Sequence, residues 1–384
     1  MKKFKGFLRL ASVALALAGG VAAAMTPQER SALDLSGYHV NNPTVALFDV
    51  PTRRAYLATT QDAMLRKRIT ALRAGPNCAA AMAMPVISGA LFTPKFYEDR
   101  AAWRQAATIY HGFEDTVDQL AAGALVANDD RHGICVLTML QHWAEQRAFL
   151  DFTPETSGIQ TWFQIESSLT AAALSYMQVR DSIAGMDTEK KTIENWLFAV
   201  AKMHLARQGG ADGSCCNNHF YRRALYAEII GVLTRDDALF RIGVSAVYSA
   251  LSDSNADGAL RLEMARGANA AKYQVYATMY LVTIAQIAKL QGYDLYQLSD
   301  GDRSLDTIIG YSLAVLRSPD HAAADAGTAD QNTEFAQEDQ YLVWLEMLAD
   351  HPAYKDSVAE FLKDKRPSYN RSLGGDITLY FYKN

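Results

Sequence analysis

The sequence of 384 residues predicts an all-α protein built from successive amphipathic helices. Apolar residues recur at three- and four-residue spacing through most of the chain, which is the period of a helix with one buried face. Alternating strand patterns are nearly absent, and alanine, the strongest helix former, is abundant. With 49% hydrophobic and 21% charged residues, the composition is that of an ordinary globular protein.

The helical pattern is clear in six stretches. The first, residues 101–127, places Trp103, Ala107, Tyr110 and Phe113 on one face. The same spacing predicts helices over residues 130–152, 188–208, 217–251, 257–290 and 338–351. One segment near the C-terminus, "DITLYFY" at residues 376–382, is compatible with a strand.

Short connectors between these helices predict antiparallel helix hairpins. No fixed-period repeat runs through the sequence, which disfavours an open regular solenoid and favours a closed ring with a central cleft. Residues 85–99 contain Gly, Pro, aromatic and basic residues, and we expect a loop that folds over the cleft. Residues 318–335 are small and polar, as in a surface loop. Neither stretch divides the chain, so we expect one domain.

The first 24 residues have the features of a secretory signal peptide. Basic residues precede an apolar run that ends in Ala22, Ala23 and Ala24, which form a small-residue cleavage site. The alternative is a membrane anchor, but a spanning helix needs roughly 20 apolar residues and the run is shorter. We therefore expect a mature domain of residues 25–384 in the periplasm or secreted, with no membrane attachment after cleavage.

Cleavage would make the chain more acidic. Residues 1–24 carry four basic and no acidic residues, so Lys and Arg fall from 37 to 33 against 42 Asp and Glu, and the net charge falls from −5 to −9. That balance argues against nucleic acid as a partner. An anionic substrate would need a locally basic site on an acidic protein.

The mature chain keeps four cysteines, and an even number in an exported protein indicates disulfides. Three pairings of Cys78, Cys135, Cys215 and Cys216 are possible. A bond between the adjacent Cys215 and Cys216 closes a small strained ring and is the less obvious choice. A metal site is disfavoured, because no second Cys or His stands at a typical ligand spacing.

The stretch "GSCCNNHFYRR" at residues 213–223 places two adjacent sulfurs directly before Asn217, Asn218 and His219. It is either a structural corner or one wall of an active site. In the structural alternative, Asn217 or Asn218 caps the helix that follows, and His219 is a satisfied structural histidine. Four further histidines stand in helical patterns and are interpreted as structural: His111, His132, His142 and His204.

A second stretch, "LEMARGANAAKYQVYATMYL" at residues 262–281, places Arg266 and Tyr273 seven residues apart, so a continuous helix would present both on one face. Ala270 lies between them and leaves room beside the guanidinium and the phenol. Gly267 inside a helix costs about 1 kcal/mol relative to alanine, which suggests close approach by another group. The plain alternative is a surface arginine and a core tyrosine that share a face by chance.

Asparagine, histidine, arginine and tyrosine together suit the β-elimination of a polymer of uronic acids. The C5 proton of a uronate is weakly acidic because the neighbouring carboxylate is already negative. Arginine can neutralise that carboxylate as a bidentate cation, and asparagine can add a hydrogen bond. Tyrosine has a pKa of about 10 that an adjacent cation would lower, and it can take the C5 proton and then protonate the leaving O4. In a mannuronate H5 and O4 lie on the same side, so a single group can do both.

These residues also carry a family resemblance. In this order, "CCNNHFY" and "ARGANAAKYQVYA" resemble the paired motifs of the alginate lyases of polysaccharide lyase family 5. "RSLGGDITLYF" at residues 371–381 is similar to the C-terminal motif of that family, and "LFTPKFYED" resembles its lid-like loop. "HWAEQRAFL" stands where the family has a Trp-Ala helix. The resemblance covers most of the mature chain.

The resemblance implies a fold and roles for particular residues. The fold is an incomplete (α/α) toroid of antiparallel helix hairpins around a central cleft. Asn218 and Arg266 would bind the substrate and neutralise its carboxylate, and Lys95 would bind substrate from the loop. His219 would assist the neutralisation and act as base on the opposite epimer, while Tyr273 would be the general base and acid. The implied disulfides are Cys78–Cys135 and Cys215–Cys216.

The sequence departs from the family pattern beside the proposed site. Arg222 stands where the family often has Trp, Asn269 replaces a usual basic residue, and Gln274 replaces a frequent His. The elimination chemistry remains plausible with these residues, but a different polyuronate becomes possible as the substrate.

We therefore predict a monomeric periplasmic lyase that cleaves alginate, an anionic polysaccharide, with a preference for mannuronate-rich polymer. The predicted reaction is β-elimination without a metal or any other cofactor. One alternative is a non-catalytic periplasmic protein that binds acidic polysaccharide, and another is a lyase for a different polyuronate. A glycoside hydrolase ranks last, because it needs two carboxylates and none stands in the marked motifs.

Overall fold

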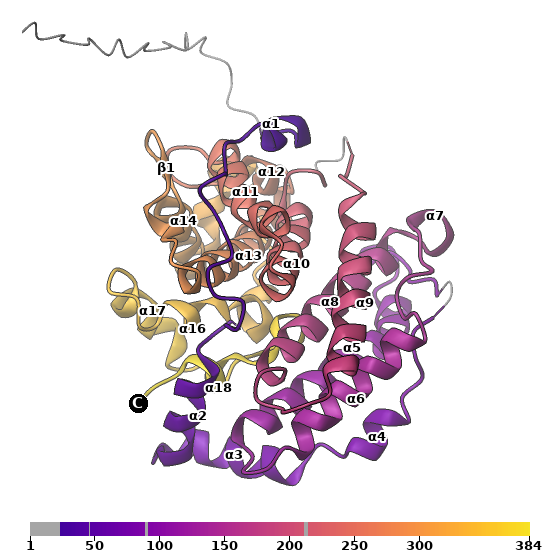
Figure 1. The fold of residues 1–384 in the computed structure, drawn as a ribbon. Coiled ribbons are helices and arrows are strands. Elements are labelled where there is room, and N and C mark those ends of the chain that lie inside the picture. Colours follow the sequence, from indigo (N-terminus) through magenta and orange to yellow (C-terminus); the bar gives the residue numbers. More distant parts are fainter. Residues whose placement is uncertain (1–23, 46, 89–90, 211–213) are drawn as a thin grey trace, which may run out of the picture.

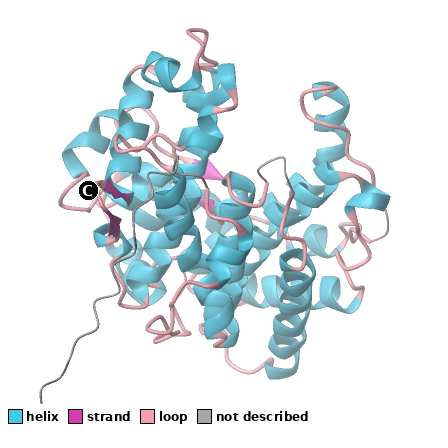
Figure 2. Cartoon of the chain, turned by 90° about the horizontal axis from the view of Figure 1, so that it is seen from above, coloured by secondary structure: helices cyan, strands magenta, loops and turns pink. Residues whose placement is uncertain are grey.

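The computed structural model describes residues 24–45, 47–88, 91–210 and 214–384, so the expected signal peptide lies outside it apart from Ala24. Helices dominate these residues and wrap around one another in two layers (Figures 1 and 2). Five helices pack side by side as an inner layer: α5 (Arg100–Val126), α8 (Ile159–Val179), α10 (Asn218–Thr234), α13 (Ala270–Leu290) and α16 (Trp344–Leu348). Each packs against a later helix of the chain, which lies outside it: α6 (Arg131–Glu145), α9 (Asp187–Leu205), α11 (Asp237–Asp253), α14 (Leu305–Arg317) and α17 (Lys355–Leu362).

Shorter elements connect these hairpins and cover their ends. The α-helices outside the two layers are α1 (Pro27–Ser31), α2 (Val50–Thr59), α3 (Ala63–Ala74), α4 (Cys78–Met82), α7 (Pro154–Ser157), α12 (Arg261–Met264), α15 (Ala323–Ala326) and α18 (Ile377–Phe381). The described strands have two residues each and form two antiparallel pairs: β1 (Ser299–Asp300) with β2 (Arg303–Ser304), and β3 (Tyr369–Asn370) with β4 (Gly375–Asp376). The predicted all-α class and ring of helix hairpins are confirmed.

Three of the inner helices, α8, α10 and α13, are buried on almost all sides. In α8, nearly every residue after Thr161 is buried, including the polar Glu166 and Ser168. A helix without a solvent-facing side carries no single apolar stripe, and helical spacing did not predict α8 from the sequence. Helices α5 and α6, which spacing did predict, keep a more exposed polar face.

Four of the predicted elements differ from the structure, and one of them, residues 257–290, is broken between α12 and α13. Residues 217–251 form two helices, because Arg235 takes a left-handed conformation (φ 58°) and the Asp236 side chain caps α11. Within residues 338–351, Asp339–Tyr341 is a 3-10 helix and only Trp344–Leu348 is α-helical. The expected strand at residues 376–382 is wrong: Ile377–Phe381 is a helix, in which four of the five residues are buried, so its burial pattern does not alternate.

The N-terminal segment, residues 25–45 and 47–49, runs along the outside of the ring as a strap (Figure 1). His39 Nδ1 lies 2.6 Å from Asp237 Oδ2 of α11, and Asn41 Nδ2 donates to the Gln291 carbonyl at 2.7 Å. The strap leads into α2, where Arg53 Nε donates to the carbonyl of Leu379 near the C-terminus at 2.6 Å. Helix α2 and the C-terminal α18 therefore lie side by side (Figure 1).

The Cys78–Cys135 disulfide joins the short α4 to α6, and this predicted pairing is confirmed. It anchors the segment that precedes residues 85–99 to the outer layer. Within the part of the chain that the structure describes, no helix combines the length and apolar character needed to cross a membrane.

Candidate active site

A cavity of about 630 Å³ opens where the inner helices begin. Its wall is formed by the first turns of α8, α10 and α13 and the first half of α5, with the loop before α5 and two C-terminal segments. Free backbone N–H groups at helix starts give this end of the ring partial positive charge. Four of the predicted site residues line the cavity together: Asn218, His219, Arg266 and Tyr273.

Arg266 and Tyr273 meet across a bend and do not lie on one helix. After α12 the chain turns at Gly267, with a φ of 58°, and passes through a 3-10 turn, Gly267–Asn269, into α13. The guanidinium carbon of Arg266 lies 4.8 Å from the centre of the Tyr273 ring. The expected continuous helix was wrong, and so was the expected close approach at Gly267, since nothing lies within 4 Å of a Cβ built there. Glycine serves the left-handed backbone of the bend.

Residues 318–335 support this bend and are more than a surface loop. The Gln331 side chain donates to the Gly267 carbonyl at 3.2 Å and accepts from the Ala271 N–H at 3.1 Å. Asn332 donates its backbone N–H to a carbonyl of the same turn at 2.7 Å. The turn that brings Arg266 to Tyr273 is therefore held by two consecutive residues, Gln331 through its side chain and Asn332 through its backbone N–H.

The Tyr273 phenol contacts the loop that precedes α5. Its oxygen lies 2.8 Å from the phenol oxygen of Tyr97. Burial and this hydrogen bond raise the pKa of Tyr273, and they outweigh the nearby Arg266, which lowers it. The expectation that the adjacent cation would bring the pKa below its ordinary value is therefore wrong for the free protein.

Asn218 is the first residue of α10 and is fixed by an acidic side chain of α12. Its backbone N–H donates to Glu263 Oε1 at 2.7 Å, and its Nδ2 lies 3.0 Å from each Glu263 carboxylate oxygen. The preceding Asn217 caps the helix, because its Oδ1 accepts from the His219 N–H at 3.0 Å. The two asparagines therefore have different roles: Asn217 caps α10, and Asn218 lines the cavity.

His219 presents a neutral imidazole to the cavity. Its ring stacks on Phe163 of α8, with ring centres 4.1 Å apart. Burial and the positive charge of Arg222 lower the pKa of His219 to about 3. Among the described residues, its Nδ1 is buried without a hydrogen-bond partner. His219 can therefore give or accept a hydrogen bond at neutral pH, but it adds no positive charge.

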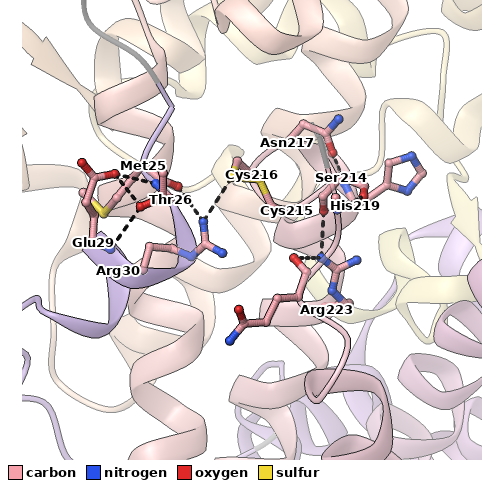
Figure 3. Close-up of a disulfide and its surroundings, with 12 residues drawn as sticks. Met25, Thr26, Glu29, Arg30, Ser214, Cys215, Cys216, Asn217, His219 and Arg223 are labelled. Atoms are coloured by element: carbon pink, nitrogen blue, oxygen red, sulfur yellow. Dashed lines mark hydrogen bonds between the residues drawn. A yellow bond between two sulfur atoms is a disulfide. The ribbon is translucent and has the colours of Figure 1, made fainter. Parts of the chain in front are cut away.

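The adjacent cysteines form the predicted Cys215–Cys216 disulfide directly before these residues, and this pairing is confirmed. Figure 3 shows Arg30 of α1 reaching the pair, with its Nη1 3.6 Å from Cys216 Sγ. The same guanidinium lies 3.8 Å from the centre of the Phe220 ring. From another side, Arg223 donates to the Ser214 carbonyl at 2.8 Å. Two arginines and a disulfide thus hold the loop that leads into α10.

Of the three departures from the family pattern, Arg222 alone lines the cavity. Its Nη2 and Nε lie 2.7 and 2.9 Å from Oε2 of the buried Glu166. Burial would raise the pKa of Glu166, but Arg222 and His204 outweigh it and lower that pKa to about 2. Gln274 points away from the cavity and bonds the backbone at Leu260.

Lys95 is not brought to the other predicted residues. Its Nζ pairs with Glu98 at 2.7 Å on the exposed loop, and it does not line the cavity. Tyr97, two residues further, does line it. The stretch "KFY" therefore lies on a loop that lines the cavity, but it does so through Phe96 and Tyr97 and not through Lys95.

Cations outnumber acids in the cavity wall. Glu114 and Glu338 are its carboxylic side chains, and burial raises the pKa of Glu114 to about 8, so Glu114 is largely protonated at neutral pH. His111, interpreted as structural, lines the cavity as well, which corrects that interpretation. The wall has six cationic side chains: Arg100, Arg104, Arg222, Arg266, Lys272 and Arg371. An acidic protein therefore carries a locally basic cavity, as an anionic ligand requires.

Comparison with known proteins gives consistent matches. A model of the alginate lyase family matches residues 82–322. A polysaccharide lyase of Stenotrophomonas maltophilia (strain K279a) is 30% identical over 270 residues, which span 68% of this chain and 78% of that protein. An alginate lyase of Azotobacter vinelandii is 28% identical over 257 residues, which span 64% of this chain and 66% of that protein.

Solved structures agree over a larger part of the chain. A variant of alginate lyase A1-III complexed with a tetrasaccharide matches with a TM-score of 0.82 at 28% identity, over 92% of this chain and 99% of that chain. The crystal structure of A1-III from Sphingomonas species A1 gives a TM-score of 0.80 at 27% identity with the same coverage.

The toroid of helix hairpins, with a basic cavity at the starts of its inner helices, thus defines a polysaccharide lyase. The chain belongs to the alginate lyase family, whose model matches more than half of its length. The family and the enzyme class that the sequence predicted are confirmed.

Proposed function

We propose that the chain is an exported lyase that cleaves alginate, with a preference for mannuronate-rich polymer, by β-elimination. The observation that carries the proposal is the placement of Arg266 4.8 Å from the Tyr273 ring, with Asn218 and His219 on the same cavity wall. The basic character of the wall supports an anionic polymer as the ligand. The alginate lyases among its relatives support alginate as that polymer.

In the proposed mechanism, Arg266 and Asn218 receive the carboxylate of the uronate to be cleaved. The guanidinium supplies positive charge and the amide supplies a hydrogen bond, so the negative charge that develops as the C5 proton leaves is stabilised. His219 is neutral, because its pKa is lowered to about 3, and it adds a further hydrogen bond to the same group. Desolvation in the buried site strengthens each of these interactions.

Tyr273 is the proposed general base and acid. Its phenolate takes the C5 proton, the C5–H electrons form the C4=C5 double bond, and the C4–O4 bond breaks. The same phenol then gives its proton to the leaving O4, which lies on the H5 side of a mannuronate. Burial raises the pKa of Tyr273, so its phenolate is a strong base, and Arg266 beside the ring stabilises that phenolate.

An ultraviolet assay tests the proposal directly. Purified protein is incubated separately with polymannuronate, polyguluronate and polyglucuronate, and the absorbance of the new C4=C5 double bond is followed. We expect the fastest rise with polymannuronate. New reducing ends without that absorbance would indicate a hydrolase, and binding without either product would indicate a binding protein. A faster rise with polyglucuronate would indicate a lyase for another polyuronate.

Export follows from the N-terminal sequence, and the proposal places the mature start at Met25. The first described helix begins two residues later, and the Met25 carbonyl already accepts from Arg30 Nη1 at 2.8 Å. Mass spectrometry of the periplasmic and culture fractions should find a chain that begins at Met25. A mass that includes residues 1–24 would contradict the cleavage.

A further inference from the structure

Glu263 lies behind the cavity wall and contacts two of the residues to which the proposed function assigns the substrate carboxylate. It is fully buried on α12. Its Oε1 accepts from the backbone N–H of Asn218 at 2.7 Å, and both carboxylate oxygens lie 3.0 Å from Asn218 Nδ2. Its Oε2 also lies 3.7 Å from Arg266 Nε. One buried carboxylate therefore joins α10 to the residue before the bend.

The acidic partner decides which way the Asn218 amide points. A carboxylate can only accept hydrogen bonds, so the amide nitrogen, and not the amide oxygen, must face Glu263. The two carboxylate oxygens subtend a much smaller angle at that nitrogen than its two hydrogens do, so one hydrogen serves both oxygens. The second hydrogen remains for a ligand in the cavity that Asn218 lines.

The same charge restrains Arg266 and suits the start of α10. Arg266 follows Glu263 by three residues, and its Nε is the atom nearest the carboxylate. Its terminal nitrogens are then left for the substrate. Burial raises the pKa of Glu263, while the hydrogen bonds from Asn218 and the charge of Arg266 oppose that shift and favour the ionised form. Negative charge is also favourable at the N-terminus of a helix such as α10.

We propose that Glu263 is a positioning residue of the elimination reaction, which fixes Asn218 as a hydrogen-bond donor and holds Arg266 in register with it. The inference rests on the proposed function, since it assigns how the carboxylate-binding pair is oriented. Without the acceptor, the Asn218 amide is free to rotate and to turn its oxygen toward the uronate carboxylate, which it would repel.

The test is a double-mutant cycle measured on polymannuronate. Glu263→Gln keeps the shape of the side chain, and we expect it to lower kcat by roughly 10- to 100-fold, as small misplacements of binding groups do. Asn218→Ala should lower kcat as well. If Glu263 acts through Asn218, adding Glu263→Gln to Asn218→Ala should cost much less than it costs alone. Fully additive losses would overturn the inference.

Asp253→Asn provides the matched control. Asp253 is also a buried carboxylate, and it accepts from the backbone N–H of Leu262 on the same short helix. It supports α12 without bonding Asn218, so its effect on kcat should add to that of Asn218→Ala. If Asp253→Asn shows the same non-additivity with Asn218→Ala, Glu263 does no more than support α12 as Asp253 does. That result would also overturn the inference.

Two further observations keep the outcomes separate. Glu263→Asp retains the charge and withdraws it by one methylene, so it replaces Glu263→Gln if that variant does not fold, and the expected loss is about tenfold or more. A wild-type protein that forms no C4=C5 absorbance would contradict the proposed function itself. An active wild type with a Glu263→Gln variant within about twofold of its kcat would contradict this inference alone.

Discussion

The phenol oxygens of Tyr97 and Tyr273 lie 2.8 Å apart, although 176 residues separate them along the chain. Tyr97 comes from the loop before α5, and Tyr273 comes from the first turn of α13. Their hydrogen bond ties the covering loop to the side chain proposed as base and acid. It also adds to the effect of burial in raising the pKa of Tyr273.

Removing the Tyr97 hydroxyl should therefore lower the pKa of Tyr273. In Tyr97→Phe, we expect the rising limb of kcat/KM against pH to move to lower pH, because this limb reports ionisation in the free enzyme. Phe92→Leu changes an exposed side chain of the same loop and should leave the limb in place. An unchanged limb in Tyr97→Phe would contradict the coupling.

Tyr273→Phe should abolish elimination and leave the cavity intact. We expect kcat to fall by at least about 10²-fold, the lower end of what general acid–base catalysis contributes. The affinity for a tetramannuronate, measured by calorimetry, should stay within a few-fold of that of the wild type. The melting temperature should stay within a few degrees of the wild-type value. A variant with near-normal kcat would show that another group takes the C5 proton.

Arg222 should matter to stability as well as to the cavity. Arg222→Gln leaves the buried carboxylate of Glu166 without its nearest cation, and loss of one partner of a buried pair costs about 3–5 kcal/mol. Urea unfolding should show this loss. Adding Glu166→Gln removes the stranded charge and should recover most of it. If the double variant is no more stable than the single one, the ion pair is not the cause.

Glu114 should make the protein less stable in alkaline solution. Burial raises its pKa from 4.5 to about 8, so its contribution to stability is complete below 4.5 and is lost as the pH rises through about 8. The melting temperature of the wild type should therefore fall between about pH 5 and about pH 9. The glutamine of Glu114→Gln cannot ionise, so the melting temperature of this variant should fall less over the same pH range. An equal fall in both proteins would assign it to other groups.

The sequence was sufficient to predict the site residues that stand close together in short motifs. Asn218 and His219 stand in one motif and Arg266 and Tyr273 in another, and the structure brings these two motifs to one cavity. The amphipathic period of α5 was visible for a similar reason, because its polar face remains exposed for part of its length. Local pattern predicted these features because each depends on residues that are close in sequence.

Features that depend on tertiary contact escaped prediction. Glu114 is a carboxylic acid in the middle of the amphipathic α5, and nothing local distinguishes it from a surface glutamate. Gln331 holds the bend at Gly267 from 64 residues away. The predicted direction of the Tyr273 pKa shift was wrong, because burial raises the pKa and outweighs the charge of Arg266. Burial cannot be read from the sequence.

The N-terminal strap bears on the order in which the chain folds during synthesis. The strap leaves the ribosome directly after the expected signal peptide, yet the partner of His39 is made 198 residues later, and that of Asn41 250 residues later. Contacts of such long range form late, because the intervening chain must first be ordered. Arg30 of the same segment braces the loop before Asn218, so the nascent chain holds an unfinished cavity. The enzyme gains its complete site only when synthesis has ended and the strap has docked.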